Sequence, residues 1–96
     1  MEHKVLSEEE KDEIIVSFLG AQERDEFCHQ LNLDRYNQML SVLPEGEWKS
    51  QIAKLRDETA QRLDEVRSII AATVPQLPPA ERVQAAKGRL QRMTGT

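Results

Sequence analysis

The stretch that decides the fold is 47-EWKSQIAKLRDETAQRLDEVRSIIAAT-73, a run of strong helix formers without glycine or proline. At a rise of about 1.5 Å per residue, the helix predicted over 47–73 is roughly 40 Å long. A compact chain of about 100 residues has a radius of gyration of about 13 Å, so this helix is longer than such a chain is wide. We therefore expect part of it to lie along a partner, a second copy of the chain, or water.

An apolar line follows one side of the predicted long helix at steps of 4, 3, 4, 4, 3, 4 and 3, through Trp48, Ile52, Leu55, Thr59, Leu63, Val66, Ile70 and Thr73. A regular coiled coil alternates steps of 3 and 4, so the doubled 4 between Leu55 and Leu63 predicts a local stutter. The small side chains of Thr59 and Ala60 weaken the line at the same place. We expect contacts near both ends, with fuller burial towards the C-terminal end, and water around the charged middle.

Three short helices are predicted before the long one, over 7–43. Ser7 and Glu10 have the spacing of a capping box, and Gly20 is placed to end the first helix, whose stripe is Ile14, Ile15, Phe18 and Leu19. Asn32 and Asp34 predict a break between a helix over 22–31 and another over 35–43. Pro44 and Gly46 then separate this cluster from the long helix.

A last helix is predicted over 79–93, because Pro75 ends the long helix and Pro79 suits the first turn of the next one. Its apolar stripe is Val83, Ala86, Leu90 and Met93. The expected fold is therefore all-α: a small bundle of three short N-terminal helices, one long helix and a short basic C-terminal helix, in a single domain over 1–96.

The charge is unevenly distributed along the chain. Residues 1–26 carry nine acidic and three basic side chains, a balance of −6, whereas residues 80–96 carry one acidic and four basic, a balance of +3. The acidic head and basic tail can pair within one chain or between copies, or the tail can meet an acidic partner such as nucleic acid. The tail lacks aromatic side chains that stack on bases, which disfavours single-strand recognition. An ordinary solubilising surface explains the same pattern.

Cys28 is the only cysteine, so an intrachain disulfide is excluded and a reducing compartment is indicated. The acidic N-terminus has no apolar run of the kind found in signal peptides, and no stretch has the roughly 20 apolar residues of a membrane span. These features predict a cytoplasmic protein without membrane contact.

No pattern in the chain indicates catalysis. Cys28 and His29 are adjacent and diverge by about 100° on a helix, so they cannot face each other as nucleophile and base; a half-buried Cys28 beside a surface His29 is expected instead. One cysteine and two histidines are too few for a tetrahedral Cys/His metal site. The paired carboxylates lie among basic side chains, as on a solvated face. We expect a protein that is not an enzyme and has no cofactor, metal or small-molecule substrate.

A helix-turn-helix over 26–40 is the alternative hypothesis. Two short helices joined by a tight turn at 31–34 match its outline, and Arg35, Tyr36, Asn37 and Gln38 would begin a recognition helix. Gln38 stands where such motifs usually carry an apolar residue, and the acidic N-terminal half repels phosphate. A plain helical hairpin is favoured over DNA recognition.

The leading expectation is a protein–protein interaction or assembly protein, of an accessory, adaptor or inhibitor type, that binds a protein partner or itself through helical surfaces. Trp and Arg often dominate interfaces. The expected partner-binding residues are Trp48, Ile52, Leu55, Val66, Ile69, Ile70, Arg82, Lys87, Arg89 and Arg92; for Trp48 a place in the core is equally compatible. In its length and acidic, capped start the chain is loosely similar to small accessory proteins of phages and mobile elements.

Overall fold

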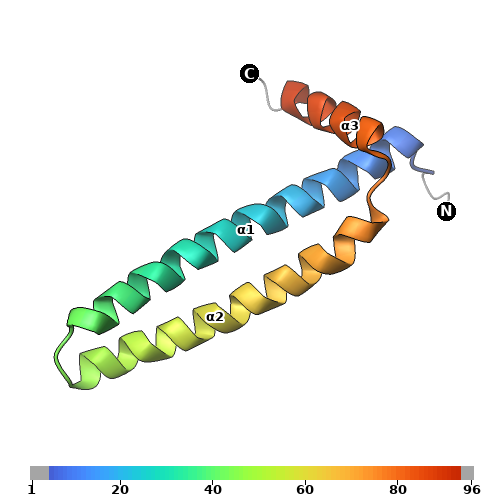
Figure 1. The fold of residues 1–96 in the computed structure, drawn as a ribbon. Coiled ribbons are helices and arrows are strands. Elements are labelled where there is room, and N and C mark those ends of the chain that lie inside the picture. Colours follow the sequence, from blue (N-terminus) through green and yellow to red (C-terminus); the bar gives the residue numbers. More distant parts are fainter. Residues whose placement is uncertain (1–4, 94–96) are drawn as a thin grey trace. The chain divides into compact units, whose positions relative to one another are not determined.

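The fold is all-α, as predicted (Figure 1). The computed structural model describes residues 5–93, which contain α1 (Glu8–Val42), α2 (Glu47–Thr73), a 3-10 turn η1 (Val74–Gln76) and α3 (Ala80–Met93), and no strand. The predicted helix over 47–73 is confirmed, and the predicted helix over 79–93 is confirmed to within one residue. The described residues form two compact units: unit 1 comprises 5–21 and 71–93, and unit 2 comprises 22–70.

The prediction of three short N-terminal helices is wrong, because residues 8–42 form the single helix α1. Gly20, Asn32 and Asp34, which were expected to mark breaks, all lie inside it. One glycine in a helix costs only about 1 kcal/mol. An interruption would leave several backbone N–H and C=O groups without helical partners at each new end. Keeping these three residues inside one helix therefore costs less free energy than ending the helix at them.

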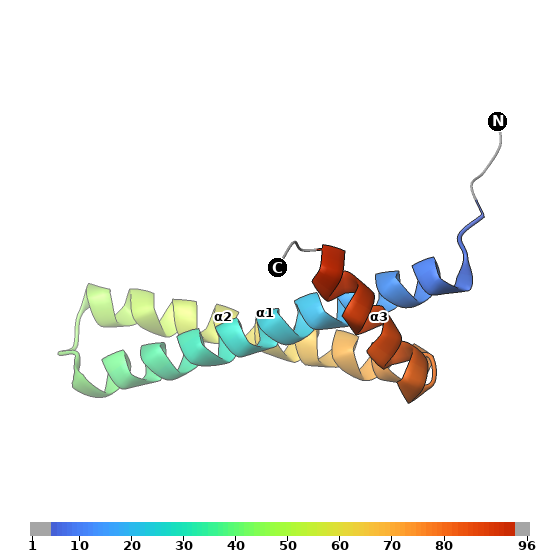
Figure 2. The same cartoon turned by 90° about the horizontal axis from the view of Figure 1, so that it is seen from above.

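Unit 2 is an antiparallel helical hairpin, in which residues 22–42 of α1 run beside residues 47–70 of α2 (Figures 1 and 2). Along residues 22–43 less exposed positions recur at alternating steps of 4 and 3: Gln22, Glu26, His29, Leu33, Tyr36 and Leu40 of α1, and Leu43 directly after it. Gln30 and Met39, which are also less exposed, adjoin members of this series. On α2 the corresponding positions are Ile52, Arg56, Thr59, Leu63, Val66 and Ile70, again at steps of 4 and 3. We call these residues the inner seam; their spacing is that of helices in a coiled coil.

The predicted stutter in α2 is wrong, because the inner seam includes Arg56 rather than Leu55. Leu55 is 42% exposed, whereas Arg56 is half-buried and Thr59 is buried. An arginine can occupy such a position because its methylene groups cover apolar surface while its charged end reaches water. The middle of α2 is thus in contact with α1, and not surrounded by water as predicted.

The expected widening of the buried stripe at the C-terminal end of α2 is wrong, because Ile69, Ala71, Ala72 and Val74 are exposed and Ile70 is only half-buried. Val66 and Thr73 are buried there, on a single narrow stripe.

The turn between α1 and α2 is made by residues 43–46. Gly46 has a φ of 151°, a conformation that residues with a side chain rarely adopt, and its carbonyl accepts from Ser50 N–H to begin α2. Lys49 donates to Glu45 at 2.8 Å, which lowers the pKa of that carboxyl. The predicted break at Pro44 and Gly46 is confirmed.

Unit 1 places α3 against the first turns of α1. The predicted capping box starts α1: Glu10 N–H donates to Ser7 Oγ at 3.1 Å, and Ser7 N–H donates to Glu10 Oε1 at 3.2 Å. Pro79 precedes α3, and its carbonyl accepts from Arg82 and Val83 N–H. The core of unit 1 is small, with Val16 of α1 and Ala86 of α3 buried.

Replacing Leu63 tests the inner seam. Leu63 is 2% exposed, so Leu63→Ala should lower the free energy of unfolding by about 2–5 kcal/mol through lost burial and an unfilled cavity. Leu31→Ala is the matched control, because Leu31 is 39% exposed in the same unit, and its effect should be about 0.5 kcal/mol or less. Urea unfolding followed by circular dichroism, at one protein concentration, measures both. Equal losses for the two variants would contradict this inner seam.

Candidate functional site

A bidentate ion pair holds helix α3 on α1. The Arg82 guanidinium donates to both carboxylate oxygens of Asp12, from Nε at 2.8 Å and from Nη2 at 2.7 Å. Asp12 is buried, with 6% of its surface exposed, and Glu8 lies 3.3 Å from Arg82 Nη2. The hydrogen bond with Asp12 raises the pKa of Arg82 above its ordinary value. A buried carboxylate requires such a partner, since an unpaired buried charge is strongly unfavourable.

A second ion pair lies two turns further along α3. Arg89 Nε donates to Glu13 at 2.7 Å, and both side chains are mostly buried. Arg89 Nη2 also reaches the backbone carbonyl of Glu9 at 3.4 Å. Arg82 and Arg89 are seven residues apart, two helical turns, and therefore contact α1 from the same side of α3.

The acidic head and basic tail thus pair within one chain, which is one of the alternatives that the charge distribution left open. Of the four tail cations predicted to bind a partner, Arg82 and Arg89 are engaged with α1. Lys87 and Arg92 are exposed and form no ion pair within residues 5–93.

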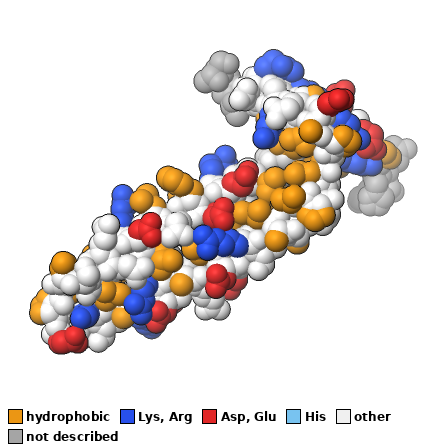
Figure 3. Space-filling model, in the orientation of Figure 1, with side chains coloured by type: hydrophobic (Ala, Val, Ile, Leu, Met, Phe, Trp, Pro, Cys, Tyr) orange, Lys and Arg blue, Asp and Glu red, His pale blue; other side chains and the backbone are white. Residues whose placement is uncertain are grey.

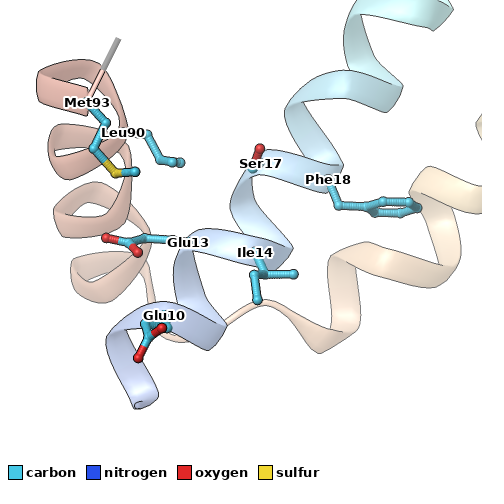
Figure 4. A pocket seen from close by; sticks show the side chains of 7 residues that line it. All are labelled: Glu10, Glu13, Ile14, Ser17, Phe18, Leu90 and Met93. Atoms are coloured by element: carbon cyan, nitrogen blue, oxygen red, sulfur yellow. The ribbon is translucent and has the colours of Figure 1, made fainter. Parts of the chain in front are cut away.

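An apolar groove lies between α1 and α3 (Figure 4). Its volume is about 490 Å³, and it is lined by Ile14, Phe18, Leu90 and Met93, with Glu10, Glu13 and Ser17 beside them. Ile14 and Phe18 lie one turn apart on α1, and Leu90 and Met93 lie on the last turns of α3. Ile14, Phe18 and Met93 are exposed although they are large and apolar. The groove can therefore take apolar side chains from another molecule.

The sequence did not indicate this groove. Ile14 and Phe18 were assigned to the buried stripe of the first helix, and Leu90 and Met93 to that of the last. Their neighbours Ile15, Val16 and Leu19 are the less exposed positions of α1. The local pattern contains both sets, and helical spacing alone does not show which of them is less exposed.

The predicted partner-binding residues of α2 fall into two groups. Ile52 and Val66 are buried and Ile70 is half-buried, all in the inner seam. Trp48, Leu55 and Ile69 are exposed, and Trp48 in particular is 58% exposed rather than part of a core. Figure 3 shows apolar side chains at the surface between charged ones.

A further contact stabilises unit 2 beside the inner seam. Arg67 of α2 donates to Glu26 at 3.1 Å and to Gln30 at 2.9 Å on α1. A shallow hollow beside it is lined by Glu23, Glu26, Phe27, Gln30 and Arg67. Because Arg67 already has two partners, this hollow offers the exposed Phe27 ring and the exposed Glu23 carboxylate.

The helix-turn-helix hypothesis loses its geometric basis. Residues 26–40 lie within the continuous helix α1, so there is no turn at 31–34 and no separate recognition helix. Tyr36 is half-buried in the inner seam, while Arg35, Asn37 and Gln38 are exposed.

The described residues offer little for catalysis or metal binding. Within 5–93 no group of three or more His, Cys, Asp or Glu side chains is arranged to hold a metal ion. No buried side-chain nitrogen or oxygen of these residues lacks a hydrogen-bond partner. Cys28 is exposed and His29 half-buried, the reverse of the expected arrangement. None of the helices in this region has the length and apolar character needed to span a membrane.

No protein-family model, curated protein or solved structure matches this chain. Function must therefore be inferred from the surfaces described above.

The Arg82 ion pair predicts how firmly α3 is docked. Arg82→Gln should increase amide hydrogen exchange across residues 83–90, because Asp12 loses its charged partner and α3 its main polar anchor to α1. Arg92→Gln makes the same chemical change on the same helix at a position without an ion pair in 5–93, and should leave exchange there unchanged. Exchange measured by mass spectrometry compares the two. Unchanged protection in Arg82→Gln would show that α3 is held by other contacts.

Proposed function

We propose that this chain is a non-enzymatic protein that acts by binding other proteins through exposed apolar surfaces of its helices. One observation carries the proposal: within residues 5–93, large apolar side chains are more often exposed than buried. Five apolar residues are buried and twelve large ones are exposed. Single exposed apolar residues are ordinary, but grouped ones mark interaction sites.

The groove of unit 1 is the first proposed binding surface. Helix-in-groove recognition uses apolar side chains at spacings of three and four residues, and Ile14, Phe18, Leu90 and Met93 offer such side chains a matching apolar lining. Glu13 beside the groove is already neutralised by Arg89, and Glu10 is engaged in the helix cap. The partner we propose is therefore an amphipathic helix of another protein that contributes its apolar face.

A place in the cytoplasm fits this proposal. Cys28 is a single, exposed thiol, and such a thiol persists in a reducing compartment. An accessory, adaptor or inhibitor role is compatible with the absence of a described catalytic group, and the identity of the bound partner distinguishes these roles.

The test is affinity capture with variants that change only the groove. Phe18→Ser combined with Met93→Ser removes two exposed apolar side chains from the lining and should reduce recovery of a groove-bound partner at least about tenfold, the effect of losing roughly 1.4 kcal/mol of binding energy. Quantitative mass spectrometry of proteins captured from the native cell measures recovery against the unmodified chain.

Phe27→Ser is the matched control, because Phe27 is also an exposed aromatic residue of α1 but belongs to unit 2 and does not line the groove. A protein recovered in stoichiometric amount with the unmodified chain and with Phe27→Ser, but not with the groove variant, supports the proposal. If no protein is recovered in stoichiometric amount, or recovery is the same with all three chains, the groove is not a binding surface.

A further inference from the structure

Helix α2 carries a second line of side chains beside the inner seam. Trp48, Leu55 and Ile69 are 58%, 42% and 39% exposed, and with the exposed Arg62 they recur at every seventh residue. Three polar residues are exposed as well: Gln51, Glu58 and Glu65. Each follows a member of the line, Trp48, Leu55 or Arg62, by three positions. Together these seven residues, which we call the outer seam, alternate steps of 3 and 4. This is the spacing of a helix that packs along another helix.

We propose that the outer seam binds the outer seam of a second copy of this chain, with the two α2 helices antiparallel about a two-fold axis near Glu58 and Thr59. The proposal rests on the proposed function, binding through exposed apolar helix surfaces, and names the partner for a surface other than the groove. It involves residues of unit 2 alone.

The apolar residues support the antiparallel register. When the outer seam is reversed about its midpoint, Trp48 falls level with Ile69 of the other copy, and Leu55 falls level with Arg62. Both apolar ends of the seam are thereby covered, and the methylene groups of each Arg62 lie over a leucine. A two-fold interface needs such a self-complementary surface. Any contact of one residue with a second residue of the other copy then occurs twice, once in each direction.

The polar residues of the outer seam support the same arrangement. In the antiparallel register Glu58 lies within one turn of Arg62 of the other copy, and Glu65 lies beside Gln51, an amide donor. In the antiparallel pair only the two Glu58 side chains meet across the axis, and Arg62 of the other copy lies within one turn of each. In a parallel pair Glu58, Arg62 and Glu65 would each meet the same residue of the other copy. Like charges in contact are unfavourable, so the antiparallel pair, with one such contact instead of three, is favoured. Neither Glu58 nor Arg62 forms an ion pair within residues 5–93, so both are available.

The small core of unit 2 gives a reason for a second copy. Its buried apolar residues are Ile52, Leu63 and Val66, all on α2, and no residue of α1 between 22 and 42 is buried. A core-facing helix usually buries a stripe at least about 100° wide, broader than one coiled-coil seam. Two hairpins joined through α2 would give each α2 two covered seams, as in a four-helix bundle.

Sedimentation equilibrium over a range of concentrations tests the association. The unmodified chain should form dimers, and Arg62→Glu should weaken them about tenfold or more, because it places four carboxylates around the two-fold axis. Combining Glu58→Arg with Arg62→Glu restores opposite charges across the axis and should restore dimerisation. Asp64→Lys is the control: it reverses a charge on the exposed side of the same helix, away from both seams, and should change the dissociation constant by less than about threefold.

Disulfide cross-linking tests the orientation in a Cys28→Ser background. Glu58→Cys lies beside the proposed axis, so it should cross-link to its own copy under oxidation. Gln51→Cys should not, because it lies level with residue 66 of the other copy, roughly 22 Å from its counterpart along the helix, and a disulfide needs Cα atoms within about 7 Å. Circular dichroism checks that every variant keeps its helical content.

The outcomes separate this proposal from the groove proposal. A monomer at all concentrations, a dimer that is unaffected by Arg62→Glu, or cross-linking by Gln51→Cys as readily as by Glu58→Cys would overturn the antiparallel outer-seam dimer. Capture of another protein that depends on Leu55 and Trp48 in a monomeric chain would also overturn it. None of these results bears on the groove variants Phe18→Ser and Met93→Ser, which alter unit 1.

Discussion

The alternating 3-and-4 spacing of the inner seam is the constraint on which unit 2 depends. A contact between two straight helices persists only if each helix presents a contacting side chain every 3.5 residues on average, with slight supercoiling. Residues 22–42 of α1 and 47–70 of α2 meet that requirement without interruption, even where the residue concerned is Gln22, Glu26 or Arg56. The 3-and-4 spacing therefore decides which residues face the other helix more than their hydrophobicity does. The same continuous contact accompanies α1 through residues that often end a helix.

Unit 1 is organised differently, around charge. Its buried apolar core is only Val16 and Ala86, and the bonds that orient α3 run from Arg82 and Arg89 to carboxylates of α1. Arginine suits this role because its planar guanidinium donates to both oxygens of Asp12 at once, which fixes direction as well as distance. With α3 so placed, Ile14 and Phe18 of α1 and Leu90 and Met93 of α3 line one groove.

Features that depend on a few neighbouring residues were predictable from the sequence. Which face of each helix packs against another helix was not. The capping box at Ser7 and Glu10, the turn at Pro44 and Gly46, and the bounds of α2 follow from hydrogen-bond supply and backbone freedom over a few residues. Leu55 and Arg56 show the limit: one is apolar and the other charged, so periodicity favours Leu55, but register against α1 selects Arg56. The groove was missed for a similar reason, since the pairs Ile14/Phe18 and Ile15/Leu19 fit a buried stripe equally well until the packing around α1 is known. Trp48, Leu55 and Ile69 were predicted to act together with Ile52 and Val66, and only the hairpin separates the exposed three from the buried two.

The two proposed surfaces differ in what keeps them available. The groove exists only while α3 is docked, and that docking depends in part on the ion pairs of Arg82, a half-exposed side chain whose charge is open to partial screening by salt. The apolar part of the outer seam belongs to one helix, α2, so it persists whatever the state of α3, and apolar burial is not weakened by salt as ion pairs are. Rising ionic strength should consequently loosen the groove before it affects the apolar contacts of the outer seam. A protein built in this way can keep one binding surface constant while the other responds to its surroundings.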